Sequence, residues 1–278
     1  MTKTDLYIVD THAHLDMSVF DKDCSDVVAR ARDAHVNKII NVGTDLESSK
    51  KAIGLAEKYP EIFAAVGFHP HDSVKVGKAH ILELTEIANH PKVVAIGEIG
   101  LDFYRNYSPR EKQIKTLRLQ LDLATQLGLP VIIHCRQAER EMLNLLHDWI
   151  SLNDSSQKQC RGVIHCFNSG KATLRQYLDM GFYISLGAYI GYPTSQMHDV
   201  ILDIPADRLV VETDCPFLPP QRYRGQRNEP AYVLLTVEVL SKITSESYEK
   251  IAQKTTNNAH HLFHLGVNSN CDSLLNIQ

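Results

Sequence analysis

Histidine and carboxylate side chains stand at the ends of most of the short apolar runs in this sequence. They are His12, His14, His69, Glu98, His134, His165 and Asp214. Imidazole nitrogens and carboxylate oxygens hold metal ions in proteins, and two histidines two residues apart in an extended segment face the same way. One histidine after a strand is usually structural, but so many ligand-type residues at equivalent places predict a metal site.

Glu98 is central to this prediction. It follows the apolar run 93–97 and stands between Gly97 and Gly100. A buried carboxylate is costly unless a cation or hydrogen-bond donors hold it. Taken alone, Glu98 would pair with an arginine, but the histidines at the other run ends favour a ligand.

The number of candidate ligands predicts the chemistry. Even without His69, four histidines and two carboxylates are more than one ion needs, and two ions can share a bridging carboxylate. Such ions, about 3.5–4 Å apart, clamp the attacking and leaving oxygens of a hydrolysis and lower the pKa of bound water to about 7. We therefore expect metal-assisted hydrolysis with two divalent ions, and the residue types suit Zn, Mg, Mn, Ni or Fe.

The elements that would position these residues alternate along the chain. Eight apolar runs indicate buried strands: 6–9, 38–42, 62–66, 93–97, 130–134, 161–165, 182–186 and 208–211. Helix-like segments separate them, which predicts parallel pairing. Eight repeats favour a (β/α)₈ TIM barrel over an open doubly wound sheet, and no GxGxxG follows the first run. The barrel would span residues 1–266 as one domain, with a loose tail over 267–278.

Composition limits the possible partners. The net charge of −4 argues against coating long stretches of nucleic acid, but not against contacts with a few phosphates. No signal peptide, membrane span or protein partner is indicated. Six scattered cysteines indicate reduced thiols and a cytoplasmic location. We expect Cys135, Cys166 and Cys215, each beside a site residue, to face away from the site.

The sequence resembles the TatD-type deoxyribonucleases, metal-dependent hydrolases built on TIM barrels. The matching blocks are DTHAHLD (10–16), GFHP (67–70), GEIGLDF (97–103), PVIIHCR (130–136), HCFNSG (165–170), ETDCPFL (212–218), RGQRNEP (224–230) and TTNNAHHLF (255–263). Many related binuclear hydrolases bridge their ions with a modified lysine on the fourth strand. Here that strand ends in Glu98, which is typical of the TatD branch.

The resemblance implies a role for each ligand-type residue. One ion would be held by His12, His14 and Asp214, and a second by His134 and His165, with Glu98 bridging the two. Asp214 would also take the proton of the attacking water as a general base. The resemblance further implies a DNA substrate, and a pocketed barrel mouth suits exonuclease action on single strands or frayed ends.

Several residues are candidates for contacting the substrate. The resemblance implies that His69 lies near a substrate phosphate, and the alternative is that it caps a helix or loop beside the following proline. Arg222 and Arg224, in the loop after the eighth strand, and Arg136 could each bind phosphate in a bidentate manner. Tyr223, between the loop arginines, could stack on a base.

Three further charged residues are interpreted as supporting ones. Arg227 and Glu229 would pair with each other and order the loop. Glu212 is two residues before Asp214 and would face the same side of the strand. We interpret it as a residue that supports a metal ligand by a hydrogen bond or salt bridge, as metal ligands usually require.

Two other functions are compatible with the same residues. An esterase or amidase, including an aminoacyl-tRNA deacylase, could use the same ions, because they polarise a carbonyl as readily as a phosphoryl oxygen. A non-catalytic nucleic-acid-binding barrel is the second alternative, and the complete ligand set argues against it.

Overall fold

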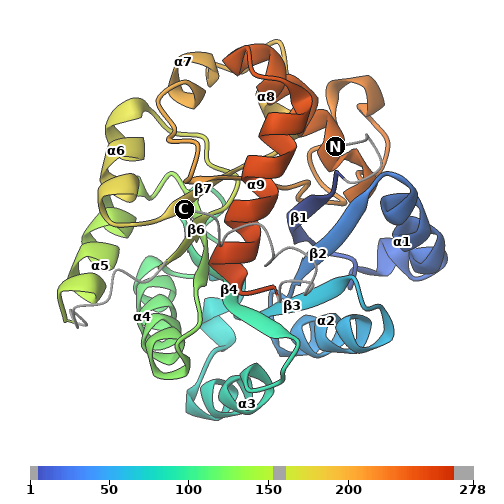
Figure 1. The fold of residues 1–278 in the computed structure, drawn as a ribbon. Helices are drawn as coiled ribbons and strands as arrows, with labels where there is room; N and C mark the ends of the chain where they lie inside the picture. The colour runs from blue at the N-terminus through green and yellow to red at the C-terminus, as the bar shows by residue number, and fades with distance from the viewer. Residues whose placement is uncertain (1–5, 153–160, 266–278) are drawn as a thin grey trace, which may run out of the picture.

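A computed structural model describes residues 6–152 and 161–265, and its eight strands form one parallel sheet (Figure 1). The strands are β1 (Ile8–Ala13), β2 (Val36–Val42), β3 (Ile62–Val66), β4 (Val93–Asp102), β5 (Val131–Arg136), β6 (Gly162–Ile164), β7 (Tyr183–Leu186) and β8 (Leu209–Val211). Their order in the sheet is their order in the sequence.

The sheet closes on itself between its first and last strands. Ala13 forms a bridge with Cys215, His14 N donates to Cys215 O at 2.8 Å, and Asp214 N donates to His12 O at 2.9 Å. The predicted (β/α)₈ barrel is therefore confirmed, and the open doubly wound alternative is wrong.

Helices surround the barrel and follow the strands in turn (Figure 1). They are α1 (Cys24–Asp33), α2 (Leu46–Lys58), α3 (Lys78–Ala88), α4 (Arg110–Leu127), α5 (Glu139–Leu152), α6 (Lys171–Asp179), α7 (His198–Ile201), α8 (Val233–Thr244) and α9 (Tyr248–Phe263). Gly128 ends α4 in the left-handed conformation, with φ of 65°. Among the described helices none is long and apolar enough to cross a membrane.

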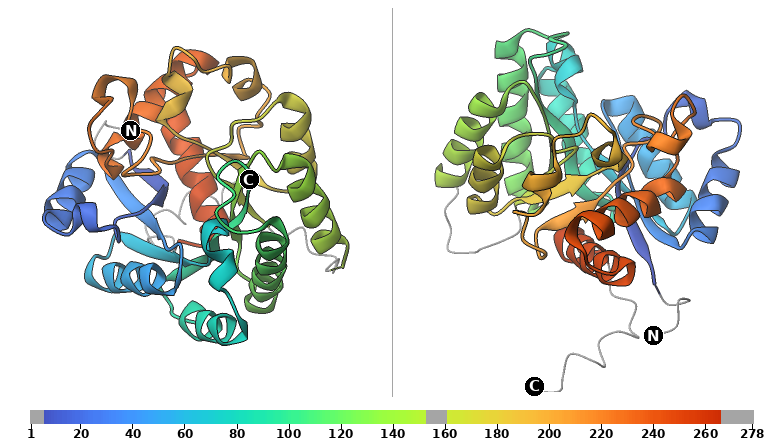
Figure 2. Two further views of the ribbon diagram at one scale, coloured as in Figure 1. Left: turned by 180° about the vertical axis from the view of Figure 1, so that it is seen from behind. Right: turned by 90° about the horizontal axis from the view of Figure 1, so that it is seen from above.

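The barrel interior is a hydrophobic core closed at one end by α9. Inward-facing strand residues such as Ile40, Ala65 and Tyr183 pack with Leu262 and Phe263 of α9. Figure 1 shows this red helix crossing the barrel opening, and the left view of Figure 2 shows the opposite end with α9 behind. The site must therefore lie at the other end, where the strands finish.

β4 is longer than the sequence predicted. It continues past residue 97 to Asp102 because it keeps pairing with β5, with Gly100 opposite His134 and Asp102 opposite Arg136. Gly100 has φ of 153°, and a Cβ there would lie 1.9 Å from His134 O. Only glycine allows the two strands to approach this closely.

The predicted domain extends slightly beyond the described ranges. The proposed tail over 267–278 lies outside the described residues. The single domain over 1–266 stays a prediction at its ends, while the described residues form one closed barrel.

Candidate metal centre

Strand alternation brings ligand-type side chains to the open end of the barrel. Ile132, Val163 and Val210 belong to the core inside the barrel. The residues two positions further along face the same way, and they are His134, His165 and Glu212.

The first group of ligand-type atoms comes from the two sides of the barrel seam and from Glu98 of β4. His12 Nε2 and His14 Nε2 lie 3.1 Å apart. Asp214 Oδ1 lies 3.8 Å and 3.5 Å from these two nitrogens, and Glu98 Oε2 lies 3.5 Å and 3.7 Å from them. Four buried or nearly buried donor atoms thus converge on one point.

The second group surrounds the other oxygen of the same glutamate. Glu98 Oε1 lies 2.7 Å from His134 Nδ1, 3.5 Å from His165 Nε2 and 3.6 Å from His69 Nε2. Each oxygen of Glu98 therefore faces its own set of histidine nitrogens. A bridging carboxylate requires this arrangement.

His69 combines the two expectations made for it. Its Nδ1 accepts from His71 N at 3.2 Å, which is the predicted loop cap. Its Nε2 nevertheless reaches Glu98, and it belongs with His134 to a group that could hold an ion. The predicted phosphate contact of His69 stays a prediction.

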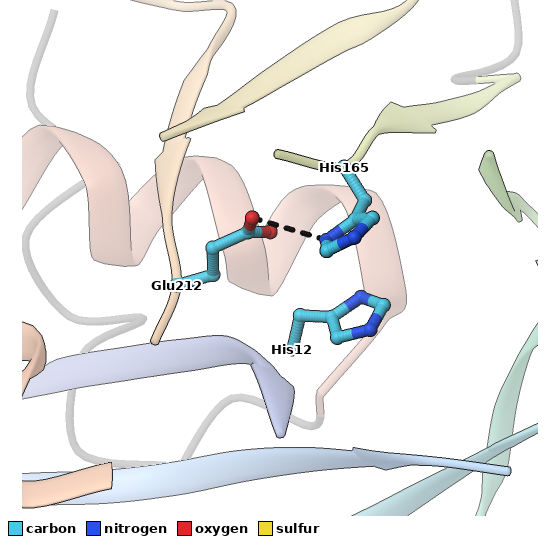
Figure 3. Close-up of side chains that lie close together, drawn as sticks. All are labelled: His12, His165 and Glu212. Carbon is cyan, nitrogen blue, oxygen red and sulfur yellow. Dashed lines mark ion pairs between the residues drawn. The ribbon is translucent and has the colours of Figure 1, made fainter. Parts of the chain in front are cut away.

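The opposite ring nitrogen of three of these histidines lies beside an oxygen atom. His14 Nδ1 lies 2.7 Å from Val42 O, and His165 Nδ1 forms an ion pair with Glu212 Oε1 at 3.0 Å (Figure 3). His134 Nε2 lies 3.3 Å from Asp102 Oδ2. Such partners fix which nitrogen faces the centre.

These contacts fit the requirements of a divalent-metal site. The donors are imidazole and carboxylate, they converge in two sets, and the rings are oriented from behind. Figure 3 also shows His12 beside His165, and their rings stack at 3.8 Å. The interpretation of Glu212 as a supporting residue is confirmed by its ion pair.

The charges around Glu98 keep the carboxylates ionised. Burial raises the pKa of Glu98, but the surrounding histidines outweigh burial and hold its pKa well below the usual range. Burial lowers the pKa of His165, yet Glu212 and Glu98 raise it to about 10. A histidine that binds a metal ion is neutral, so binding of an ion by His165 would release a proton.

The expectation that Cys166 faces away from the site is wrong. Cys166 lines the cavity, and its sulfur lies within 4.8 Å of ligand atoms of His165 and Asp214. Because β6 ends at Ile164, strand alternation does not extend to Cys166, whose φ is 47°. Burial raises the pKa of the Cys166 thiol well above its usual range.

A cavity of about 1250 Å³ opens above the centre. Arg136 lines it, with its guanidinium 4.1 Å from the centre of the Tyr104 ring. Arg222 and Arg224 are not among the described residues that line it. Arg222 lies over the Tyr223 ring at 5.1 Å. The substrate contacts of all three arginines stay predictions.

The loop after β8 is tied to α1 by ion pairs. Arg227 Nη2 lies 2.9 Å from Glu229 and 2.6 Å from Asp23, and Arg30 Nε lies 2.8 Å from Glu229. The predicted pairing of Arg227 with Glu229 is confirmed. Tyr223 stacks on Tyr232 at 4.3 Å.

Asp102 is a site residue that the sequence did not indicate. It is fully buried at the end of β4, and its Oδ2 lies 3.0 Å from His71 Nε2 and 3.3 Å from His134 Nε2. If the sequence analysis had extended the strand past residue 97, strand alternation would have placed Asp102 on the same face as Glu98. It holds one candidate ligand and one histidine that lines the cavity.

Replacing Asp102 with asparagine should weaken the second ion set without unfolding the barrel. Asparagine keeps the size but loses the charge that fixes His134, and such supporting carboxylates are worth about 10–100-fold in metal affinity or activity. Metal titration of the Asp102→Asn protein measures the loss. The matched control is Asp122→Asn on the outer helix α4, and equal metal affinity in both variants would contradict the assignment.

Comparison with known proteins identifies relatives along nearly the whole chain. The family model described as TatD related DNase matches residues 9–264. An uncharacterized metal-dependent hydrolase, YabD, of Bacillus subtilis is 37% identical, covering 93% of this chain and 99% of its own. The 3'-5' ssDNA/RNA exonuclease TatD of Salmonella typhimurium is 35% identical, covering 91% and 98%. The crystal structure of YJJV, a TatD homolog from Escherichia coli K12, has a TM-score of 0.86 at 33% identity, covering 92% and 98%.

Proposed function

Because this chain belongs to the TatD-related DNase family of metal-dependent hydrolases, we propose that it cleaves phosphodiester bonds of DNA with two divalent ions. The observation that carries this proposal is the position of the Glu98 carboxylate. Its two oxygens face separate sets of histidine nitrogens, as a carboxylate shared by two ions requires.

Each ligand-type residue has a role in this proposal. His12, His14 and Asp214 would hold one ion and His134 and His165 the other, with Glu98 between them. Divalent ions would polarise the phosphodiester and lower the pKa of the attacking water.

Asp214 would accept the proton of that water. Burial raises the pKa of Asp214, but His14 and its neighbours lower it below the usual value, so the carboxylate is ionised at neutral pH. Its side chain also lines the cavity, where a water and a phosphate would meet. His69 and Arg136 line the same cavity and would contact the phosphate. Arg222 and Arg224 would add further phosphate contacts, and Arg224 lies over the ring of Tyr192, which lines the cavity.

The substrate we propose is a free strand end. The Salmonella relative is named a 3'-5' ssDNA/RNA exonuclease, which supports a single-stranded substrate for this chain too. A concave site inside a barrel mouth admits a chain end more readily than a continuous duplex. The free thiols among the described cysteines agree with the cytoplasmic location that we propose.

End-labelled oligonucleotides test the proposal directly. Single-stranded DNA, duplex DNA and RNA are incubated with the protein and Mg²⁺, Mn²⁺ or Zn²⁺. We expect stepwise shortening of single strands that stops on chelation and resumes when metal is restored. Shortening that persists after complete metal removal would contradict the mechanism. Hydrolysis of aminoacyl-tRNA or a carboxylic ester, with no oligonucleotide cleaved, would favour the esterase alternative.

A further inference from the structure

An exposed aromatic ring lies beside the candidate metal centre, and it has no role in the proposed hydrolysis. Phe217 is 48% exposed and lines the cavity. Its ring centre lies 6.1 Å from that of His14. Because Phe217 lines the cavity, its exposed ring offers an apolar face to a ligand there.

The backbone holds this ring in place. Phe217 N donates to Asp214 O at 2.9 Å, and Asn228 Nδ2 donates to Phe217 O at 2.7 Å. Asn228 is buried and also donates to Thr213 O at 2.8 Å, next to the candidate ligand Asp214. The loop is therefore fixed relative to the centre before any ligand arrives, which lowers the entropy cost of binding.

The two sides of the cavity differ in chemistry. Phe217 and the partly exposed Met17 supply apolar surface beside β1 and β8. Arg105 and Arg136 supply cations beside β4 and β5, which lie across the barrel in the strand order. One ligand that combines a flat apolar face with anionic groups is a nucleotide within a single strand.

We infer that Phe217 is the stacking platform for the nucleobase next to the scissile phosphate, an inference that rests on the proposed function. A base within a duplex has both faces covered by its neighbours, so it cannot lie on this ring. A base at a free or frayed end exposes one face. Phe217 would thereby select single-stranded ends, while the cations opposite receive the phosphates.

Phe217→Ala compared on normal and abasic substrates tests this inference. Stacking of a base on an aromatic side chain is lost in the variant, so we expect kcat/KM on single-stranded DNA to fall about tenfold. The substrates carry an abasic residue at one of the last three positions. When the abasic residue stands at one of these positions, the wild-type and Phe217→Ala proteins should cleave the strand with equal kcat/KM. On normal DNA, the Phe217→Trp protein should retain wild-type activity.

A matched control separates this effect from a general loss of exposed aromatic surface. Tyr7 is 47% exposed and precedes β1 at the other end of the barrel, so Tyr7→Ala should leave kcat/KM unchanged. If the wild type cleaves DNA but Phe217→Ala loses activity equally on every substrate, or loses none, the inference is overturned and the proposed function stands.

A binding measurement makes the inference independent of catalysis. The Phe217→Trp protein, freed of metal by chelation, is titrated with oligothymidylate and with an abasic strand of equal length. We expect tryptophan emission to be quenched only by the strand that carries bases, and the wild type, with Trp149 on α5, to show no change. Equal responses to both strands would overturn the inference even if the protein cleaves no oligonucleotide.

Discussion

Replacing Glu98 with glutamine is expected to lower kcat/KM for single-stranded DNA by on the order of 10³-fold or more, because the two proposed ions would supply several kcal/mol of transition-state stabilisation. Glutamine keeps the volume of this 4% exposed side chain. It removes the charge and one of the two oxygens that face the histidine sets, so both ions should be held less tightly.

Elemental analysis of the purified protein reports the loss of metal, and circular dichroism reports whether the barrel remains folded. Glu139→Gln is the matched control, because Glu139 also lines the cavity but bonds only to Ser169 among the described contacts. A Glu98→Gln protein with full metal content and wild-type kcat would show that Glu98 is not the bridge.

Replacing Asp214 with asparagine should separate proton transfer from metal binding. Asparagine retains an oxygen near His12 and His14 but cannot accept a proton, and loss of a general base costs about 10²–10⁴-fold in rate. We therefore expect kcat to fall by that factor while KM changes little.

Rates measured at saturating metal distinguish this outcome from simple loss of an ion. Asp72→Asn is the control, because Asp72 also lines the cavity but pairs with Lys75 at its surface. If excess metal restores the Asp214→Asn protein to the wild-type rate, Asp214 is a ligand only and another group must take the proton.

The barrel, and the gathering of the candidate ligands at its open end, could be predicted because both leave local marks in the sequence. A parallel strand buried on both faces gives a short apolar run, and strand alternation places a ligand just beyond it. The contacts behind the ligands leave no such mark. Whether Glu212 reaches His165, or Val42 O reaches His14, depends on side-chain rotamers and on strands that meet only in the folded barrel.

The two errors near the site share a physical cause. Glycines after residue 96 resemble a strand end, yet pairing with β5 carries β4 on to Asp102. In contrast, β6 stops at Ile164, so alternation did not place Cys166 correctly. Strand length was set by the neighbouring strand in both places, and a single sequence does not contain that information.

The proposed site of the first ion spans the seam between β1 and β8, so metal binding there would have to follow closure of the barrel. His12 and Asp214 stand on the two sides of the seam, and nearly the whole barrel must be synthesised between them. An ion bound by both residues would stabilise the closed seam, since its binding free energy adds to the stability of the closed barrel. The strand synthesised last would thus be fixed to the strand synthesised first. The stability of the closed barrel would then depend on the concentration of metal ions in the cell.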